Sequence, residues 1–128
     1  MTLRLELCLG DRSGTTLAEF AMLMPLFFVL VIGIVQVGQM LWTQAALQHA
    51  VEMAARCATV NATSCGTSAN IQSFATTQAY GMSFPNSVFS ASTPSCGNEV
   101  SASYTYVFQT AVLPLTQVVL TAQSCFPK

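Results

Sequence analysis

Residues 13–42 read SGTTLAEFAMLMPLFFVLVIGIVQVGQMLW, and this stretch decides the fold. From Phe20 to Trp42 it contains no charged residue. As an α-helix, residues 20–42 span about 35 Å, against a bilayer hydrocarbon core of about 30 Å. A core helix in so small a protein would be shorter and would have a polar face. The stretch therefore predicts a transmembrane helix over residues 20–42.

The composition of the whole chain fits a protein that lies partly in a membrane or packs among copies of itself. Of its 128 residues, 52% are hydrophobic and only 7% are charged, against about 25% in an ordinary soluble protein. The net charge of -1 excludes an electrostatic nucleic-acid binder, which needs a basic patch to replace counterions. Intrinsic disorder is also excluded, because disordered chains are poor in apolar residues and rich in charge.

The segment before the apolar run, residues 1–14, is short and polar. It holds four of the charged residues of the chain: Arg4, Glu6, Asp11 and Arg12. The run that follows is too long for the 7–15-residue apolar region of an ordinary signal peptide. Because the side-chain charges of the segment cancel, only the N-terminal amine orients it under the positive-inside rule. We expect the N-terminus in the cytoplasm and the C-terminal part outside it.

A single carboxylate, Glu19, lies at the head of the otherwise uncharged helix. It can lie among lipid headgroups, or favour the helix N-terminus through the macrodipole. Its spacing offers a second interpretation, because a cut after Gly14 would place a new amine on Thr15, four residues earlier on the same helix face. An α-amino group has a pKa of about 7.7–8.0, so the mostly positive amine could pair with Glu19 of its own or a neighbouring chain. In a stack of identical helices, such a pair would set the axial register.

These motifs resemble those of a known family. A polar leader ending in glycine, a glutamate five residues later and a long apolar helix are similar to a type IV prepilin, with Gly14 as the cleavage glycine. Phe20 follows Glu19 where the tight-adherence branch has tyrosine, a conservative departure. With AEFA at 18–21, Pro25, the glycine-bearing apolar run and AARCA at 54–58, residues 13–60 resemble a TadE-like minor pseudopilin of the Tad (tight adherence) system.

The resemblance implies a processing step, a location and partners. A prepilin peptidase would cut between Gly14 and Thr15 on the cytoplasmic side, removing the leader peptide 1–14. The protein would span the bacterial inner membrane once, with incorporation into an extracellular pilus as a further option. It would act in assembly of the Tad (Flp-type IVb) pilus for surface adherence. Its partners would be other pilin or pseudopilin subunits, the Tad inner-membrane assembly machinery and the lipid bilayer.

The helix is expected to continue beyond the membrane, so that it covers residues 15–58. After Trp42 the chain is rich in good helix formers, and every fourth residue is polar. This polar stripe consists of Gln44, Gln48, Glu52 and Arg56. The opposite side is apolar and small: Leu47, Ala50, Val51, Ala54 and Ala58. The extension is thus amphipathic, as expected of a helix that packs on a domain.

Three residues inside the apolar run interrupt its regularity. Pro25 removes one backbone hydrogen bond and is expected to kink or locally unwind the helix. Gly33 and Gly38 are five residues apart, so they form no GxxxG motif, but their small size would let a neighbouring helix approach. Proline and glycine are also ordinary constituents of membrane helices, so both interpretations stay open.

Residues 59–128 predict a small domain outside the cytoplasm. The periodicity indicates a short helix over about 69–80, strands over 100–108 and 115–124, and a weaker strand over 87–92. The expected fold class is therefore α+β. A long N-terminal helix would extend into a pilin-like domain with a short helix and an antiparallel sheet of about three strands.

Four cysteines lie outside the leader: Cys57, Cys65, Cys96 and Cys125. An even number outside the cytoplasm suggests disulfides, and four cysteines allow three pairings. We favour Cys57 with Cys65 and Cys96 with Cys125, because these bonds join segments that the sequence already places together. A metal site is the rival interpretation, but the chain has no CxxC motif and no second ligand set beside it.

The chain offers little to catalysis. It has no Ser/His/Asp set, no glycine-rich phosphate loop and no paired carboxylates, and its one histidine, His49, has no metal-ligand partner on the helix. We expect no enzyme activity, no cofactor and no small-molecule substrate, with His49 at the surface and Trp42 as an interfacial anchor. The alternative function is an uncleaved single-pass membrane protein that serves as an assembly or docking factor in the cell envelope.

Overall fold

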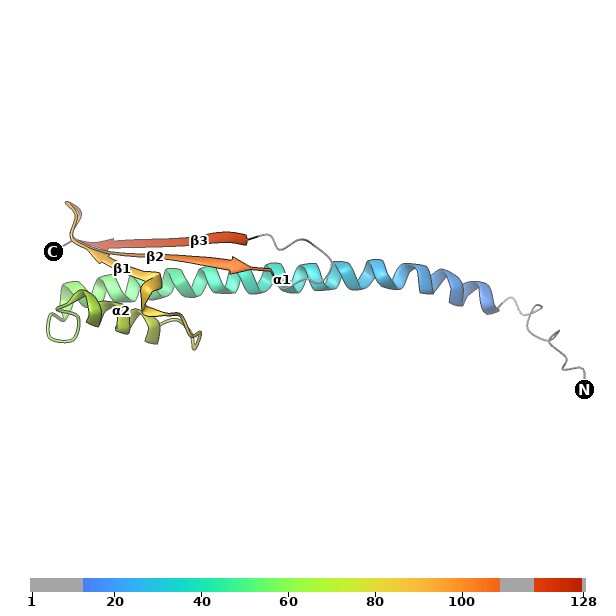
Figure 1. Ribbon diagram of the computed structural model, residues 1–128, viewed down its shortest axis with the longest axis horizontal. Coiled ribbons are helices and arrows are strands. Elements are labelled where there is room, and N and C mark those ends of the chain that lie inside the picture. The colour runs from blue at the N-terminus through green and yellow to red at the C-terminus, as the bar shows by residue number, and fades with distance from the viewer. Residues whose placement is uncertain (1–12, 109–116, 128) are drawn as a thin grey trace, which may run out of the picture. The chain divides into compact units, whose positions relative to one another are not determined.

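A long helix precedes a second helix and a small sheet. Helix α1 (Ser13–Val60) is followed by α2 (Ser68–Thr77), the 3₁₀ helix η1 (Asn86–Val88) and the strands β1 (Phe89–Ser92), β2 (Asn98–Val107) and β3 (Gln117–Phe126) (Figure 1). The computed structural model of the protein describes residues 13–108 and 117–127. One long apolar helix, one further helix and three antiparallel strands make an α+β protein, which confirms the predicted fold class.

The chain divides into two units, residues 1–35 and residues 36–128. The described part of the first unit is the N-terminal portion of α1, which contains Pro25 and is helical throughout. The second unit contains the rest of α1, helix α2 and the sheet. The boundary between the units falls after Val35, inside the apolar run of the sequence.

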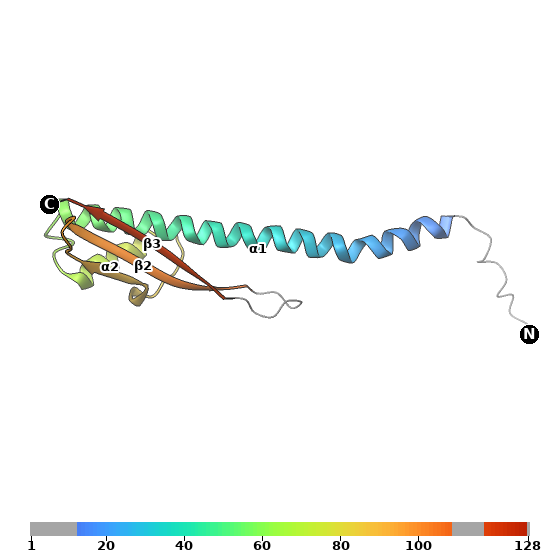
Figure 2. The same ribbon diagram turned by 90° about the horizontal axis from the view of Figure 1, so that it is seen from above.

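The sheet of the second unit is antiparallel with the order β1-β2-β3. Strands β2 and β3 pair along their whole length, from Asn98↔Phe126 to Val107↔Gln117, and lie side by side in both views (Figures 1 and 2). Burial alternates along the strands, so that Ala102 and Ala122 face the core while Ser103 is exposed. This period of two produces one packed face and one hydroxyl-rich face.

The core of the second unit forms where α1, α2 and the sheet meet. The apolar stripe expected on α1 is the part that packs, because Leu47, Ala50, Val51 and Ala54 are fully buried and Ala58 is half-buried. Alanines on this stripe let the other elements approach the helix closely. The other core residues come mainly from α2 and the strands: Ile71, Ala75, Ala79, Phe84, Phe89, Val100, Ala102, Leu120 and Ala122.

Two side-chain amides hold the sheet to α1. Gln44 donates from Nε2 to the backbone oxygen of Thr121 at 2.8 Å. Asn98 donates from Nδ2 to the oxygen of Ala58 at 3.3 Å and to Oγ1 of Thr59 at 3.2 Å. Because the last carbonyls of a helix have no intrahelical partner, the Asn98 contact also satisfies part of the C-terminal end of α1.

Helix α2 ends earlier than the sequence pattern suggested. Thr67 caps its start by accepting from the backbone N–H of Asn70 at 3.3 Å. The helix was expected over 69–80, but it ends at Thr77, since Tyr80 and Gly81 have φ values of 49° and 77°. A backbone in the left-handed region cannot continue a right-handed helix.

The strands match the expected ones with small shifts. Residues 86–88 form a 3₁₀ helix, so β1 begins at Phe89 rather than at residue 87. Strand β3 begins at Gln117 and ends at Phe126; residues 115 and 116, where it was expected to start, lie outside the described residues.

Two disulfides join the segments that proximity in the sequence favoured. Cys57 in the last turn of α1 bonds to Cys65 in the loop before α2, and Cys96 before β2 bonds to Cys125 near the end of β3. Beside the second bond, Gly97 has a φ of 130°, and a Cβ there would collide with the backbone of Phe126. Glycine is needed at this turn so that the two strand ends can approach each other.

Candidate functional site

The processing motif lies in the first turns of α1. The helix begins at Ser13, so Gly14 and Thr15 have helical backbone, and Glu19 follows Thr15 by about one turn on the same face. The first N–H groups of a helix have no intrahelical partner, and glycine is a poor helix former. Unwinding at Ser13 and Gly14 would therefore disturb few hydrogen bonds. The Gly14–Thr15 bond thus lies in a part of the helix that is held by few hydrogen bonds.

The side chains of Glu19 and Phe20 project from the helix into the surroundings. Both side chains are exposed, Phe20 to 61%. Among the side chains of residues 16–108 and 117–127, the carboxylate of Glu19 has no hydrogen-bond or ion-pair partner. Any partner for this charge would therefore have to come from outside the described residues.

The large apolar side chains that follow are also exposed. The structure contains one described helix that is long and apolar enough to cross a membrane, judged by length and composition, and none of its most apolar stretch is buried. Large side chains point in every direction around it: Met22, Leu23, Leu26, Phe27, Phe28, Leu30, Ile32 and Ile34. Soluble proteins rarely expose so much contiguous apolar surface. This exposed apolar surface is consistent with a helix that could span a membrane.

Pro25, Gly33 and Gly38 have no packing role within the described chain. Pro25 is exposed inside the helix. A Cβ added at Gly33 or Gly38 would meet nothing within 4 Å. Packing inside the protein therefore does not require glycine at these positions. The interpretation that they leave room for a neighbouring helix stays a prediction.

His49 is more enclosed than expected. It was expected at the surface, but it is half-buried, with its ring stacked on Tyr80 at 4.4 Å between centroids. Its Nδ1 lies 3.0 Å from the backbone oxygen of Gln78, and since a carbonyl can only accept, Nδ1 carries the proton. Tyr80 also contacts Trp42, with centroids 6.0 Å apart. His49 therefore positions the end of α2.

Tyr80 was not identified as a candidate site residue from the sequence. The only hint was an aromatic residue directly before Gly81 at the end of a predicted helix. That hint could not show that the ring returns to α1.

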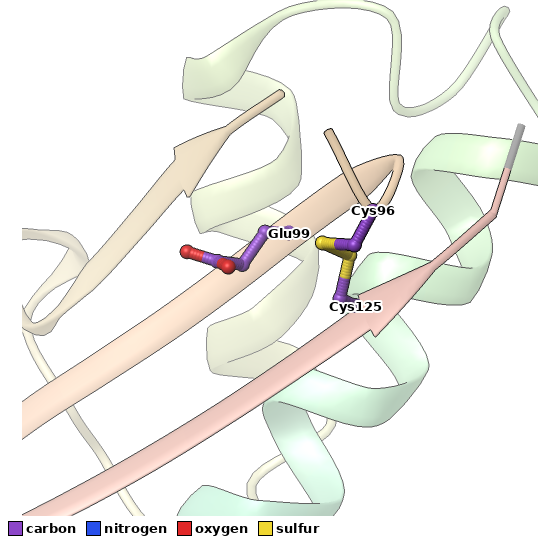
Figure 3. Close-up of side chains that lie close together, drawn as sticks. All are labelled: Cys96, Glu99 and Cys125. Atoms are coloured by element: carbon purple, nitrogen blue, oxygen red, sulfur yellow. A yellow bond between two sulfur atoms is a disulfide. The ribbon is translucent and has the colours of Figure 1, made fainter. Parts of the chain in front are cut away.

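The one side-chain group whose geometry could suit a metal ion, among the described residues, is Cys96, Glu99 and Cys125. Their ligand atoms lie within 4.8 Å of one another, but the two sulfurs are bonded as a disulfide and offer no thiolate (Figure 3). The carboxylate of Glu99 extends away from the sulfurs and accepts from Ser92 Oγ at 3.3 Å and Gln123 Nε2 at 2.9 Å. This cluster therefore has a structural role, because the disulfide and the two hydrogen bonds of Glu99 connect the three strands.

Two hollows on the surface of the second unit carry little chemistry. One is lined by hydroxyl, amide and small apolar side chains, including Gln48, Ser101 and Thr121. The other contains Glu99, which already accepts two hydrogen bonds, and the disulfide-bonded Cys65. Neither hollow brings a nucleophile next to a free base, which acyl or phosphoryl transfer would require.

The comparisons with known proteins agree with the N-terminal motif. Residues 14–56 match the family model of TadE-like proteins. The match begins at Gly14 and includes Glu19, Phe20, Pro25 and both glycines of the apolar run. No curated protein and no solved structure matches the chain. The resemblance deduced from the motifs over residues 13–60 is thus confirmed over residues 14–56, and residues 57–128 lie beyond the match.

Proposed function

We propose that this TadE-like protein of the Tad pilus system is a minor pseudopilin, processed by a prepilin peptidase between Gly14 and Thr15. The processed chain would act in assembly of the Tad pilus for surface adherence. The family match carries this proposal, because it begins at the expected cleavage glycine and continues through Glu19 and the exposed apolar helix.

The exposed state of Glu19 supports a role between subunits. Once the leader is removed, the amine of Thr15 would be available to the Glu19 carboxylate of an adjacent chain. The next charged residue along the sequence is Glu52, so no cation within the apolar run competes for this carboxylate. An unpaired charge costs about 2.5–3.5 kcal/mol at the bilayer centre, which favours any arrangement that pairs it.

The proposed location is the bacterial inner membrane, crossed once, with the N-terminus in the cytoplasm and the domain outside. The two disulfides support the outer position of the domain, because such bonds persist in oxidising compartments. The proposed partners are the prepilin peptidase, other pilin or pseudopilin subunits, the Tad inner-membrane machinery and lipid. We assign the chain no catalytic role, no nucleic acid and no small-molecule substrate.

One observation favours the alternative of an uncleaved membrane-anchored assembly or docking factor. The backbone at Ser13 and Gly14 is already helical, so a peptidase would first have to unwind it. The anchor would then keep its leader, and Glu19 would lie near the cytoplasmic headgroups without a new amine beside it.

Intact mass and N-terminal sequencing of the membrane fraction separate the two functions. In cells with active prepilin peptidase, the proposal requires a chain that begins at Thr15. Gly14→Ala should lower processing only partly, because a small side chain still fits, whereas Gly14→Leu should block it. Gly38→Leu is the matched control, since a side chain there meets nothing in the protein, and it should be processed normally. A wild-type chain that still begins at Met1 would refute the pseudopilin assignment.

A further inference from the structure

The surroundings of α1 change between Val35 and Gln36. From Thr16 to Val35 every side chain is exposed except that of Met24, which is half-buried. From Gln36 onward the helix gains contacts within the second unit, where Met40 packs against the core and Thr43 is buried. The helix therefore passes from a segment without protein partners to one with them inside the predicted span 20–42.

One end of the sheet lies beside Gln36 and Gln39 of α1, within the second unit. Gln36 and Gln39 line a hollow together with residues 104–107 of β2. Strand β1 pairs only with residues 99–102 of β2, and β3 is the outer strand of the sheet, so backbone edges at this end have no strand partner among the described residues. In hydrocarbon each unsatisfied backbone group costs several kcal/mol, and lipid-exposed sheet edges do not occur there.

The hydrocarbon span must therefore end before Gln36. Residues 17–35 form a helix of about 28 Å, which matches the hydrocarbon core of about 30 Å. This placement leaves Gln36, Gln39 and the end of β2 at the level of the headgroups. Trp42 follows Val35 by about 10 Å along the helix.

Two aromatic rings lie exposed at this outer level. Trp42 is 60% exposed and Tyr80 is 56% exposed, with ring centroids 6.0 Å apart. His49 stacks on Tyr80 and donates from Nδ1 to the carbonyl oxygen of Gln78, so the connection after α2 is held against α1. Helical side chains lean toward the helix N-terminus, which directs the Trp42 ring toward the bilayer.

The strained backbone at Tyr80 indicates that a tyrosine is needed at this position for a reason other than packing in the core. Tyr80 is the only non-glycine residue with a positive φ among the residues that the structure describes. The left-handed region costs an ordinary L-residue about 1–2 kcal/mol, whereas glycine or asparagine would make the same turn with less strain. A ring that stays more than half exposed recovers little of this cost from the core.

We propose that Trp42 and Tyr80 form a paired anchor that binds the outer headgroup layer of the bilayer, just beyond a hydrocarbon span that ends at Val35. Tyrosine and tryptophan favour this layer because each ring has an apolar body and a polar tip. The contact does not depend on anionic lipid, because Arg56 and Lys128 are the only cationic residues after the leader. The paired anchor rests on the proposed membrane anchoring of the chain. Co-flotation of the chain with vesicles tests that anchoring separately.

Trp42 is the only tryptophan, so its fluorescence reports its own depth. The full chain is reconstituted in phosphatidylcholine vesicles that carry a quencher either at the headgroup, in mid-chain or, as iodide, in water. Three further chains carry Trp42→Phe together with Val31→Trp, Tyr80→Trp or Val60→Trp. Val31 marks the hydrocarbon, and Val60, 77% exposed at the end of α1, marks water.

The expected result is that tryptophan at positions 42 and 80 emits at shorter wavelength than at position 60, and is quenched most by the headgroup label. Position 31 should respond to the mid-chain quencher and position 60 to iodide. Replacing part of the phosphatidylcholine with phosphatidylglycerol, or adding salt, should leave the pattern unchanged.

Two patterns would overturn the paired anchor while leaving membrane anchoring intact. Mid-chain quenching at position 42 would mean that the span extends to Trp42, and iodide quenching at position 80 would mean that Tyr80 faces water. A chain that does not float with vesicles, with position 31 open to iodide, would instead refute the anchoring itself. Retention of both disulfides in each variant checks that the domain has folded.

Discussion

Helix α1 uses apolar residues in two opposite ways. Up to Val35 its apolar side chains are large, surround the helix and are exposed, as Leu30 is to 57%. From Thr43 to Ala58 they are mostly small and lie mainly on one side, and Leu47 is fully buried. The two portions thus differ both in hydrophobicity and in how their apolar side chains are distributed around the helix. An apolar helix without a polar face requires an apolar surrounding, whereas an apolar stripe on a polar helix requires a domain.

The carboxylates of α1 give the largest expected contrast between its portions. Glu19→Ala would leave a proposed intersubunit amine unpaired in an apolar assembly, and loss of one partner of a buried pair costs about 3–5 kcal/mol. We expect normal cleavage but a strong loss of the subunit from the pilus machinery, measured by co-purification and pilus yield. Glu52→Ala removes an exposed carboxylate from the second portion and is the control. Normal assembly with Glu19→Ala would contradict the pairing.

The same leucine truncation in each portion tests the burial difference. Leu47→Ala should destabilise the second unit by about 2–5 kcal/mol, because it leaves a cavity in a packed core. Leu30→Ala should leave the unfolding midpoint nearly unchanged, since this side chain is 57% exposed and lies outside the second unit. Thermal unfolding in detergent, followed by circular dichroism of the sheet, measures both. Equal losses would mean that the exposed portion packs in the monomer.

The two disulfides should differ with the length of chain that they close. The bond Cys96–Cys125 spans 29 residues and Cys57–Cys65 spans 8. A chain-entropy estimate assigns them about 3.5 and about 2.5 kcal/mol, respectively. We expect the double Cys96→Ser/Cys125→Ser variant to lower stability more than Cys57→Ser/Cys65→Ser, measured by denaturant unfolding. The reverse order would show that the end of α1 depends on its bond more than the sheet does.

The smallest effect concerns the cap of α2. Thr67→Ala removes the side chain that accepts from Asn70, and loss of an N-cap costs about 1 kcal/mol. Thr67→Ser should preserve stability, and Thr63→Ala, at an exposed loop position, should be neutral. The denaturation midpoint of the second unit distinguishes the three variants. Equal denaturation midpoints for Thr67→Ala and Thr63→Ala would show that the Thr67 cap does not stabilise the second unit.

Much of the second unit was predictable because its elements have clear local patterns. The apolar stripe around Leu47 and Ala54 on α1 identified the packed side of the helix, and alternation around Val100 and Ala102 identified a strand. The cysteine pairs followed from which elements are neighbours in the sequence. The end of α2 was missed, because left-handed backbone at a tyrosine follows from its surroundings and not from its local propensity.

The sequence by itself determined the long apolar helix, the lone Glu19 five residues after Gly14, and the α+β class, because hydrophobic period and charge placement are local properties. Only the tertiary structure brought Tyr80 to Trp42 and His49, and only it placed the end of β2 beside Gln36 and Gln39. Those contacts join residues far apart in the chain, and packing of the whole second unit decides them. For that reason the sequence identified a helix long and apolar enough to cross a membrane, while the structure identified the residues of the second unit that pack on its C-terminal portion.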